Sequence, residues 1–139
     1  MLAQREHSRL ELARKLARYT EDQSEIEQVL DDFQRRGWLS EQRVVEQIAV
    51  SRRRRFGARR IAHELREKGI SEDAIGAALP QLKDSELAAA REVWRRKFGA
   101  LPANARDKAR QMRFLQGRGF DPDVIRQLLK TSGTTDERE

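Results

Sequence analysis

The side chains best suited to chemistry in this chain are arginines, and the chemistry that arginine clusters offer is anion binding. Residues 51–69 read SRRRRFGARRIAHELREKG and hold six arginines within nine residues, namely Arg52, Arg53, Arg54, Arg55, Arg59 and Arg60. A second basic group follows Trp94 and consists of Arg95, Arg96 and Lys97. Guanidinium groups can hold a phosphate or a carboxylate through two parallel hydrogen bonds. We therefore expect these nine cations to form the binding surface, although many basic runs are only solvated helix faces.

The remaining polar residues do not form a pattern typical of catalysis or metal binding. The two histidines, His7 and His63, are too few for a metal site in a chain without cysteine. Ser8 lies beside His7, but nothing completes a triad. The chain also lacks a phosphate-binding loop of the GxxxxGK[ST] kind. We expect no enzyme activity, no catalytic residue, no metal and no cofactor.

Composition favours a thin helical protein with an anionic partner. Hydrophobic and charged residues each make up 37% of the 139 residues, whereas charged residues make up about 25% of a typical globular chain. So few apolar residues predict narrow buried stripes on helices rather than a large spherical core. The net charge of +6 favours nucleic acid or an acidic protein groove as partner. Neither a membrane-length apolar run nor a signal-peptide pattern occurs, so we expect a cytoplasmic protein without membrane contact.

An internal repeat must position the cations. A triplet of leucine, isoleucine and leucine, spaced 10 and then 4 residues apart, recurs three times at offsets of 49 and 50; the triplets are Leu16, Ile26 and Leu30, then Leu65, Ile75 and Leu79, then Leu115, Ile125 and Leu129. Predicted N-caps recur with it, at Ser8, Gly57 and Asp107 and again at Asp22, Ser71 and Asp121. Gly69 and Gly119 correspond as turn residues between the paired helices. A further helix is predicted between copies, at residues 40–55 and 85–98, and residues 1–6 resemble its stub before the first copy.

These patterns predict an all-α fold, an elongated and curved array of three tandem three-helix repeats. We expect repeat 1 at residues 1–37 with a short first helix, repeat 2 at 38–83, repeat 3 at 84–130, and a disordered tail at 131–139. Pro80 predicts that its helix kinks or ends near Leu79. The connector at residues 100–105, ALPANA, is the expected bend between repeats.

Three blocks of the sequence resemble the RecX family, whose members regulate the recombinase RecA. They are REHSRLEL, SRRRRFGARRIAHELREKGIS and RFLQGRGFDPDVIRQLL, which occur in this order over about residues 5–129. Three blocks in this order at sensible spacing make the resemblance strong. The family is built from three tandem three-helix repeats, which agrees with the repeat found above.

The resemblance implies a binding protein that lies in the groove of the RecA–DNA filament and blocks filament growth or promotes disassembly. Such a protein limits the strand exchange, ATPase and coprotease activities of RecA. The implied partners are the RecA filament and single- or double-stranded DNA, the DNA being bound weakly and non-specifically; we expect a monomer. The residues alone leave an alternative open, a stand-alone DNA-binding helical protein with helix-turn-helix-like units.

Gly57 suggests a more specific anion site. It stands at a predicted helix start and has no side chain that could cap the helix. Backbone N–H groups would then be free among flanking arginines, and a helix start of this kind binds anions. We therefore expect an anion site here, at the hinge between the first and second repeats.

Overall fold

The structure is a computed structural model that describes the backbone of residues 5–138 and the side chains of residues 5–130. Every regular element within residues 5–138 is an α-helix. In chain order the helices are α1 (Arg9–Leu16), α2 (Gln23–Arg35), α3 (Glu41–Arg52), α4 (Ala58–Glu67), α5 (Glu72–Asp84), α6 (Glu86–Lys97), α7 (Ala105–Gly117) and α8 (Pro122–Arg138). Among the described residues, no helix combines the length and apolar character that a bilayer crossing requires.

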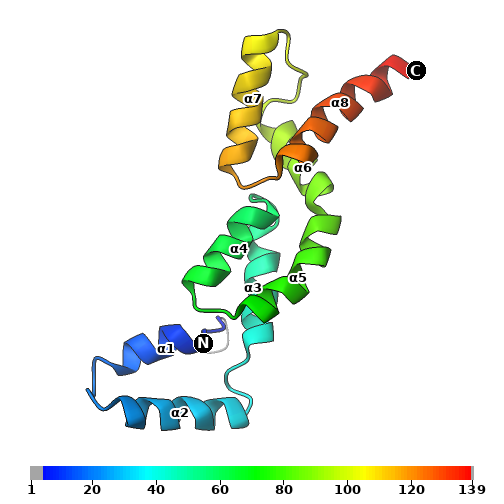
Figure 1. Cartoon of the computed structure of the whole chain (residues 1–139). Helices are drawn as coiled ribbons and strands as arrows, with labels where there is room; N and C mark the ends of the chain where they lie inside the picture. Colours follow the sequence, from blue (N-terminus) through cyan, green and yellow to red (C-terminus); the bar gives the residue numbers. More distant parts are fainter. Residues whose placement is uncertain (1–4, 139) are drawn as a thin grey trace.

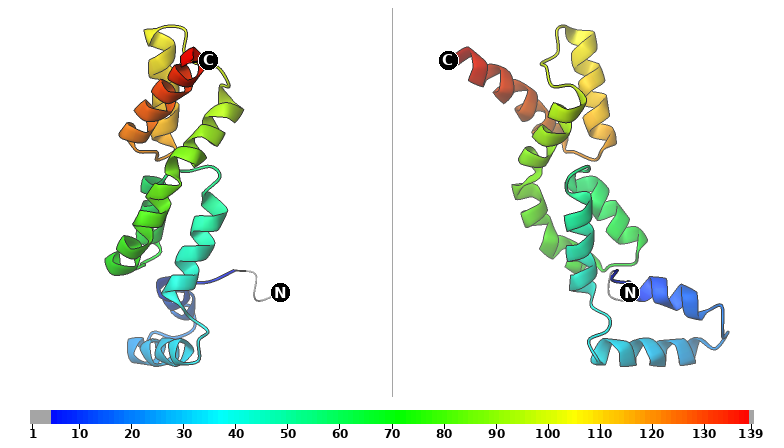
Figure 2. Two further views of the ribbon diagram at one scale, coloured as in Figure 1. Left: turned by 90° about the vertical axis from the view of Figure 1, so that its right-hand side faces the viewer. Right: turned by 180° about the vertical axis from the view of Figure 1, so that it is seen from behind.

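The helices form the elongated, curved array that the sequence predicted (Figure 1). Helices α1 and α2 lie at one end, α3 to α5 in the middle, and α6 to α8 at the other end, and the views in Figure 2 show the same order. Within the described residues the first repeat thus consists of two helices, and each later repeat has three.

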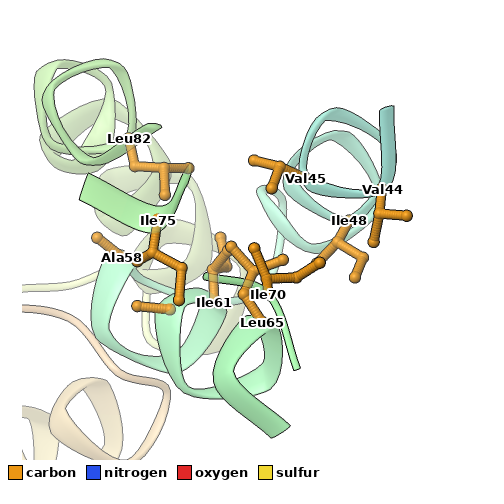
Figure 3. Packing of buried hydrophobic residues seen from close by; sticks show 10 residues of the cluster. Val44, Val45, Ile48, Ala58, Ile61, Leu65, Ile70, Ile75 and Leu82 are labelled. Carbon is orange, nitrogen blue, oxygen red and sulfur yellow. The ribbon is translucent and has the colours of Figure 1, made fainter. Parts of the chain in front are cut away.

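Each repeat buries a hydrophobic core of its own. In the middle repeat, Val45 and Ile48 of α3, Ile61 and Leu65 of α4 and Ile75 of α5 belong to one buried hydrophobic cluster (Figure 3). A fully buried side chain of this size contributes about 1.5–3 kcal/mol. The cores of the end repeats contain Ile26, Leu30 and Leu39 in the first and Leu115, Phe120 and Ile125 in the third. Because such small cores give little stability alone, packing between repeats is needed to support them.

Caps and turns follow the repeat as expected. Ser8 begins α1 with a capping box, in which its hydroxyl accepts from the Glu11 N–H at 3.1 Å and the Glu11 carboxylate accepts from the Ser8 N–H at 2.8 Å. Asp22 and Ser71 cap α2 and α5 in the same register. Gly119 has a φ of +87°, in the left-handed region that glycine adopts without strain.

Both junctions between repeats use a close approach at a turn glycine. A Cβ on Gly69 would lie 2.8 Å from the Cβ of Leu10 in the preceding repeat, and a Cβ on Gly119 would lie 2.7 Å from the backbone nitrogen of Arg60. A side chain is therefore excluded at each of these glycines for two reasons, the close approach of the neighbouring repeat and the positive φ of the glycine itself. Thr20 occupies the corresponding position in the first repeat, where the described chain supplies no earlier helix to pack against it.

The start of α7 differs from the prediction. Its N-cap is Asn104, and Asp107, which the repeat had suggested, lies inside the first turn. The Asn104 side chain accepts from the Asp107 N–H at 2.8 Å, while the Asp107 carboxylate accepts from the Ala103 N–H at 3.2 Å. Asparagine caps a helix as well as aspartate does, and an acidic residue three positions later returns a hydrogen bond. The connector at residues 100–105 is non-helical as far as Asn104.

Pro80 does not end its helix. Helix α5 continues through Pro80 to Asp84. Of the two predicted outcomes, a kink or an end near Leu79, the end is therefore wrong. Pro80 is exposed, and Leu82, beyond it, is buried in the middle core. Burial of Leu82 holds the last turn of α5 in place, and water can reach the carbonyl that the proline leaves without a donor.

The described part of the chain begins with a short non-helical stretch and ends in helix α8. Residues 5–8 precede α1 without helical structure, and the rest of the predicted stub at residues 1–6 lies outside the described residues. Helix α8 continues to Arg138, although the sequence predicted a disordered tail at 131–139; residue 139 lies outside the described residues. Extending an existing helix adds one hydrogen bond for each residue fixed. The repeat boundaries at 37, 83 and 130 stay predictions.

Candidate anion-binding cleft between two repeats

The predicted basic run reaches both junctions between repeats. Arg52, Arg55 and Arg60 line a cleft between the first and second repeats, whereas Arg54 and Arg55 line one between the second and third. The part of the run that follows α3 faces the side of α6 and the last turn of α7 (Figure 1). A cleft of about 540 Å³ opens where these three helices meet. We call it the junction cleft, and its lining residues are Ser51, Arg54, Arg55, Val93, Arg96, Lys97, Phe114 and Arg118.

The junction cleft is lined by five cations and by no carboxylate. Arg54 and Arg55 come from the end of α3, Arg96 and Lys97 from α6, and Arg118 from the turn after α7. Three elements separated in sequence thus bring positive charge to one concave surface. Clustered charges of one sign in a cleft attract an oppositely charged ligand more strongly than the same charges on an open surface.

Arg118 also lines the junction cleft, although the site prediction omitted it. Its guanidinium carbon lies 5.5 Å from the ring centre of Phe56 and 5.0 Å from that of Phe114, so two aromatic rings hold it. The repeat itself carried a signal for this position. A cation directly precedes the turn glycine in both later repeats, as Lys68 and as Arg118. In the first of these places, Lys68 pairs with Glu11 across the other junction at 3.1 Å.

Several predicted binding arginines instead tie helices together. Arg52 donates two hydrogen bonds to the Glu64 carboxylate, at 2.8 and 3.0 Å. This guanidinium holds the pKa of Glu64 below its usual value, because it stabilises the ionised carboxylate more than burial destabilises it. Arg53 donates to the Gln81 and Leu82 carbonyls at the end of α5, at 3.1 and 3.4 Å. These contacts join α3 to α4 and α5 within the second repeat.

Three more of the predicted cations also have intramolecular partners. Arg59 pairs with Asp121 of the third repeat at 3.2 Å, and Arg95 pairs with Glu92 on its own helix at 3.0 Å. Arg60 covers the Phe56 ring, with its guanidinium carbon 4.3 Å from the ring centre. Of the nine predicted cations, the junction cleft therefore brings together Arg54, Arg55, Arg96 and Lys97, and not the other five.

The expected anion site at the Gly57 helix start is wrong, because the backbone donors there are occupied. The Gly57 N–H donates to the Arg118 carbonyl at 2.8 Å, and the Arg59 N–H donates to the Gly119 carbonyl at 3.2 Å. The Ala58 N–H points to the buried Glu86 carboxylate at 3.4 Å. The third repeat thus occupies the N-terminus of α4. Glycine is needed at position 57 because the two repeats pack closely there, and not because an anion binds.

A second cleft, of about 690 Å³, lies between the first and second repeats, and Arg52, Arg55 and Arg60 of the basic run line it. It contains carboxylates as well as cations. Glu11 and Glu64 are paired with Lys68 and Arg52, and Glu67 lies 3.3 Å from His63. This cleft therefore has mixed charge, in contrast to the junction cleft.

The aromatic residues beside the basic groups pack against the hydrophobic cores. Trp94 is buried and its indole N–H donates to Gln111 at 2.9 Å, while Phe98 packs edge-on against Phe114. Phe56 is half-buried against the middle core. No group of three histidine or acidic residues among the described residues is arranged to hold a metal ion.

Fold and site together define a class: an all-helical repeat protein with a cationic cleft where two of its repeats meet. Comparison with known proteins identifies the family within this class. Family models described as "RecX, second three-helix domain" and "RecX, third three-helix domain" match residues 40–79 and 84–129.

Whole-chain relatives agree with these matches. A protein named "Regulatory protein RecX" from Leptothrix cholodnii is 56% identical over 129 residues, which cover 93% of this chain and 82% of the relative. One of the same name from Chromobacterium violaceum is 47% identical, covering 93% and 84%. A crystal structure of RecX from Lactobacillus salivarius has a TM-score of 0.75 over 94% of this chain and 88% of that one; at 17% identity it supports the fold alone. The chain belongs to the RecX family.

Proposed function

We propose that this protein regulates RecA by binding in the groove of the RecA–DNA filament, where it blocks filament growth or promotes disassembly. It thereby limits strand exchange, ATP hydrolysis and coprotease activity by RecA. It acts as a cytoplasmic binding protein and catalyses no reaction itself. It works as a monomer and binds single- or double-stranded DNA weakly.

The observation that carries the proposal is the junction cleft, with five cations and no carboxylate. A RecA–DNA filament presents DNA phosphates beside protein, so its groove offers anions that match this lining. The family supplies the regulatory role, since relatives up to 56% identical are named regulatory proteins.

The shape of the array also supports the proposal. An elongated, curved chain of repeats (Figure 2) can lie along a groove and make modest contacts at more than one repeat. Linked weak contacts give an overall affinity well above that of any one of them. The junction cleft would then act together with the mixed-charge cleft at the neighbouring junction.

The test is inhibition of RecA strand exchange by two variants with the same change in net charge. Arg54→Gln with Arg55→Gln removes two cations of the junction cleft. Arg35→Gln with Arg36→Gln removes two exposed arginines of the first repeat, which pair with Asp32. We expect the cleft variant to need at least about tenfold more protein for half-inhibition, since two lost charge-assisted contacts exceed the free energy of one decade.

The control variant should inhibit RecA as the wild type does, and both variants should keep the wild-type helical circular dichroism. A folded cleft variant that inhibits as well as the wild type would remove the junction cleft from the mechanism. Inhibition lost equally in both variants would show that net charge alone matters.

A stand-alone DNA-binding protein remains the second candidate, and the lack of carboxylates in the junction cleft favours it too. Units that read the major groove as helix-turn-helix proteins do would bind particular duplexes selectively and without RecA. Equal affinity for duplexes of random sequence would exclude that mode of binding.

A further inference from the structure

The cations of the junction cleft have few partners within the protein. The Arg54 and Arg55 side chains are exposed and make no ion pair with the described residues. Lys97 likewise has no carboxylate partner among them and lies 5.2 Å from the ring centre of Phe114. Arg96 donates to the backbone carbonyl of Arg54 at 2.7 Å, which leaves its positive charge uncompensated. The charge collected here is therefore available to a ligand.

The aromatic rings beside the cleft are already covered. Phe56 has the guanidinium carbons of Arg55, Arg60 and Arg118 at 5.8, 4.3 and 5.5 Å from its centre. Phe114 is approached by Lys97 and Arg118, and Phe98 packs edge-on against it. A nucleobase stacks on a ring only where the ring face is open. These rings position the cations and leave no open platform for bases.

We infer that the junction cleft binds consecutive phosphates of a nucleic-acid backbone and makes no contact with the bases. Arg54, Arg55, Arg96, Lys97 and Arg118 are the phosphate-binding residues. The inference rests on the proposed function, and it assigns the DNA part of that function to this cleft. Arg52, Arg53 and Arg59 belong to the internal framework, because their partners are Glu64, the end of α5 and Asp121.

A backbone fits this lining better than a small anion does. Five cations around one cleft of about 540 Å³ require several negative charges for neutralisation. A nucleic-acid strand supplies them at a regular spacing, about one charge for every 3.4 Å. The neighbouring cleft holds carboxylates among its cations, and two of them, Glu11 and Glu64, already occupy Lys68 and Arg52. The phosphate site is accordingly confined to the junction between the second and third repeats.

The experiment measures binding of labelled single-stranded oligo-dT by fluorescence anisotropy over a range of salt concentrations, without RecA. The variant carries Arg54→Gln, Arg55→Gln and Lys97→Gln. The control carries Arg35→Gln, Arg36→Gln and Arg66→Gln, with the same change in net charge. Each phosphate contact contributes about 0.7 to the slope of log affinity against log salt. The cleft variant should therefore lose about 2 units of slope, and the control should lose none.

Two further ligands test the mode of binding. An abasic oligonucleotide of the same length should bind within about threefold of oligo-dT, because loss of even one stacked base would cost about tenfold. Inorganic phosphate should compete no better than chloride at equal ionic strength. An unchanged slope in the cleft variant, much weaker binding of the abasic strand, or displacement by inorganic phosphate would each overturn the inference.

RecA inhibition separates this inference from the proposed function. Suppose that the triple cleft variant binds oligo-dT with the reduced salt dependence yet still inhibits RecA. This result would contradict the proposed role of the cleft in RecA regulation and leave the phosphate site standing. The reverse result, with inhibition lost and the slope unchanged, would contradict the phosphate site alone.

Discussion

Replacement of Gly57 by alanine tests whether the second and third repeats are locked together. Gly57 has φ −85° and ψ 175°, an extended conformation that alanine adopts freely. The substitution therefore adds no backbone strain of its own. The new Cβ would lie 2.6 Å from the carbonyl carbon of Gly119 and 2.6 Å from the Cα of Phe120. Both are backbone atoms, so relief requires that the third repeat move away.

The cost can be worked out from the contacts at this junction. Movement weakens the hydrogen bonds from Gly57 to Arg118 and from Arg59 to Gly119, at 2.8 and 3.2 Å, each worth about 1 kcal/mol. Overpacking adds about 1–3 kcal/mol. We expect a loss of about 3–5 kcal/mol in the free energy of unfolding, measured by urea denaturation followed by circular dichroism.

Gly76 provides the matched control. It lies exposed in α5, and a Cβ there would meet nothing within 4 Å. Gly76→Ala should stabilise the protein by about 0.5–1 kcal/mol, because alanine loses less backbone entropy in a helix. A Gly57→Ala protein that is as stable as the wild type would refute the close packing of the two repeats.

Three further substitutions probe the framework by urea denaturation. Glu86→Ala removes a buried carboxylate that accepts from the Asp121 N–H at 3.0 Å and faces the Ala58 N–H; it should cost about 2–3 kcal/mol, and an unchanged midpoint would contradict that role. Burial tends to raise the pKa of Glu11, but the Ser8 N–H, Lys68 and Arg5 together lower it to about 2. Since the pKa of Glu11 in the folded protein lies below its ordinary value of 4.5, this stabilisation is complete above pH 4.5 and is lost as the pH falls towards 2. With solvent screening it amounts to about 1 kcal/mol. Glu11→Gln should remove that part of the acid sensitivity, and an identical pH profile would argue against it. Pro80→Ala should raise stability by about 1–3 kcal/mol, because it restores a helical N–H donor; a loss would show that Pro80 is needed for the shape of α5.

The repeat could be predicted from the sequence because it depends on local patterns. Ser8, Asp22 and Ser71 cap helices where their side-chain oxygens meet nearby N–H groups. Gly69 and Gly119 have positive φ at the two corresponding turns. These features are determined within a few residues, so spacing alone located them.

The site was harder to predict because it depends on contacts between repeats. Nothing near Gly57 in sequence shows that the turn at Gly119 fills the start of α4. Likewise, the role of Arg52 depends on Glu64 of the next helix, and that of Arg118 on Phe56 of another repeat. A basic run gives the number of cations, whereas the fold decides which of them remain available.

Site-specific crosslinking tests most directly whether the junction cleft faces the RecA–DNA filament. The chain has no cysteine, so a single introduced thiol can carry a benzophenone at one chosen position. Ser51→Cys places it in the junction cleft, and Ser24→Cys places it on the exposed face of α2 as a control. After irradiation with filaments assembled on single-stranded DNA, position 51 should crosslink to the filament far more than position 24. Equal crosslinking at both positions, or crosslinking at position 24 alone, would contradict the account.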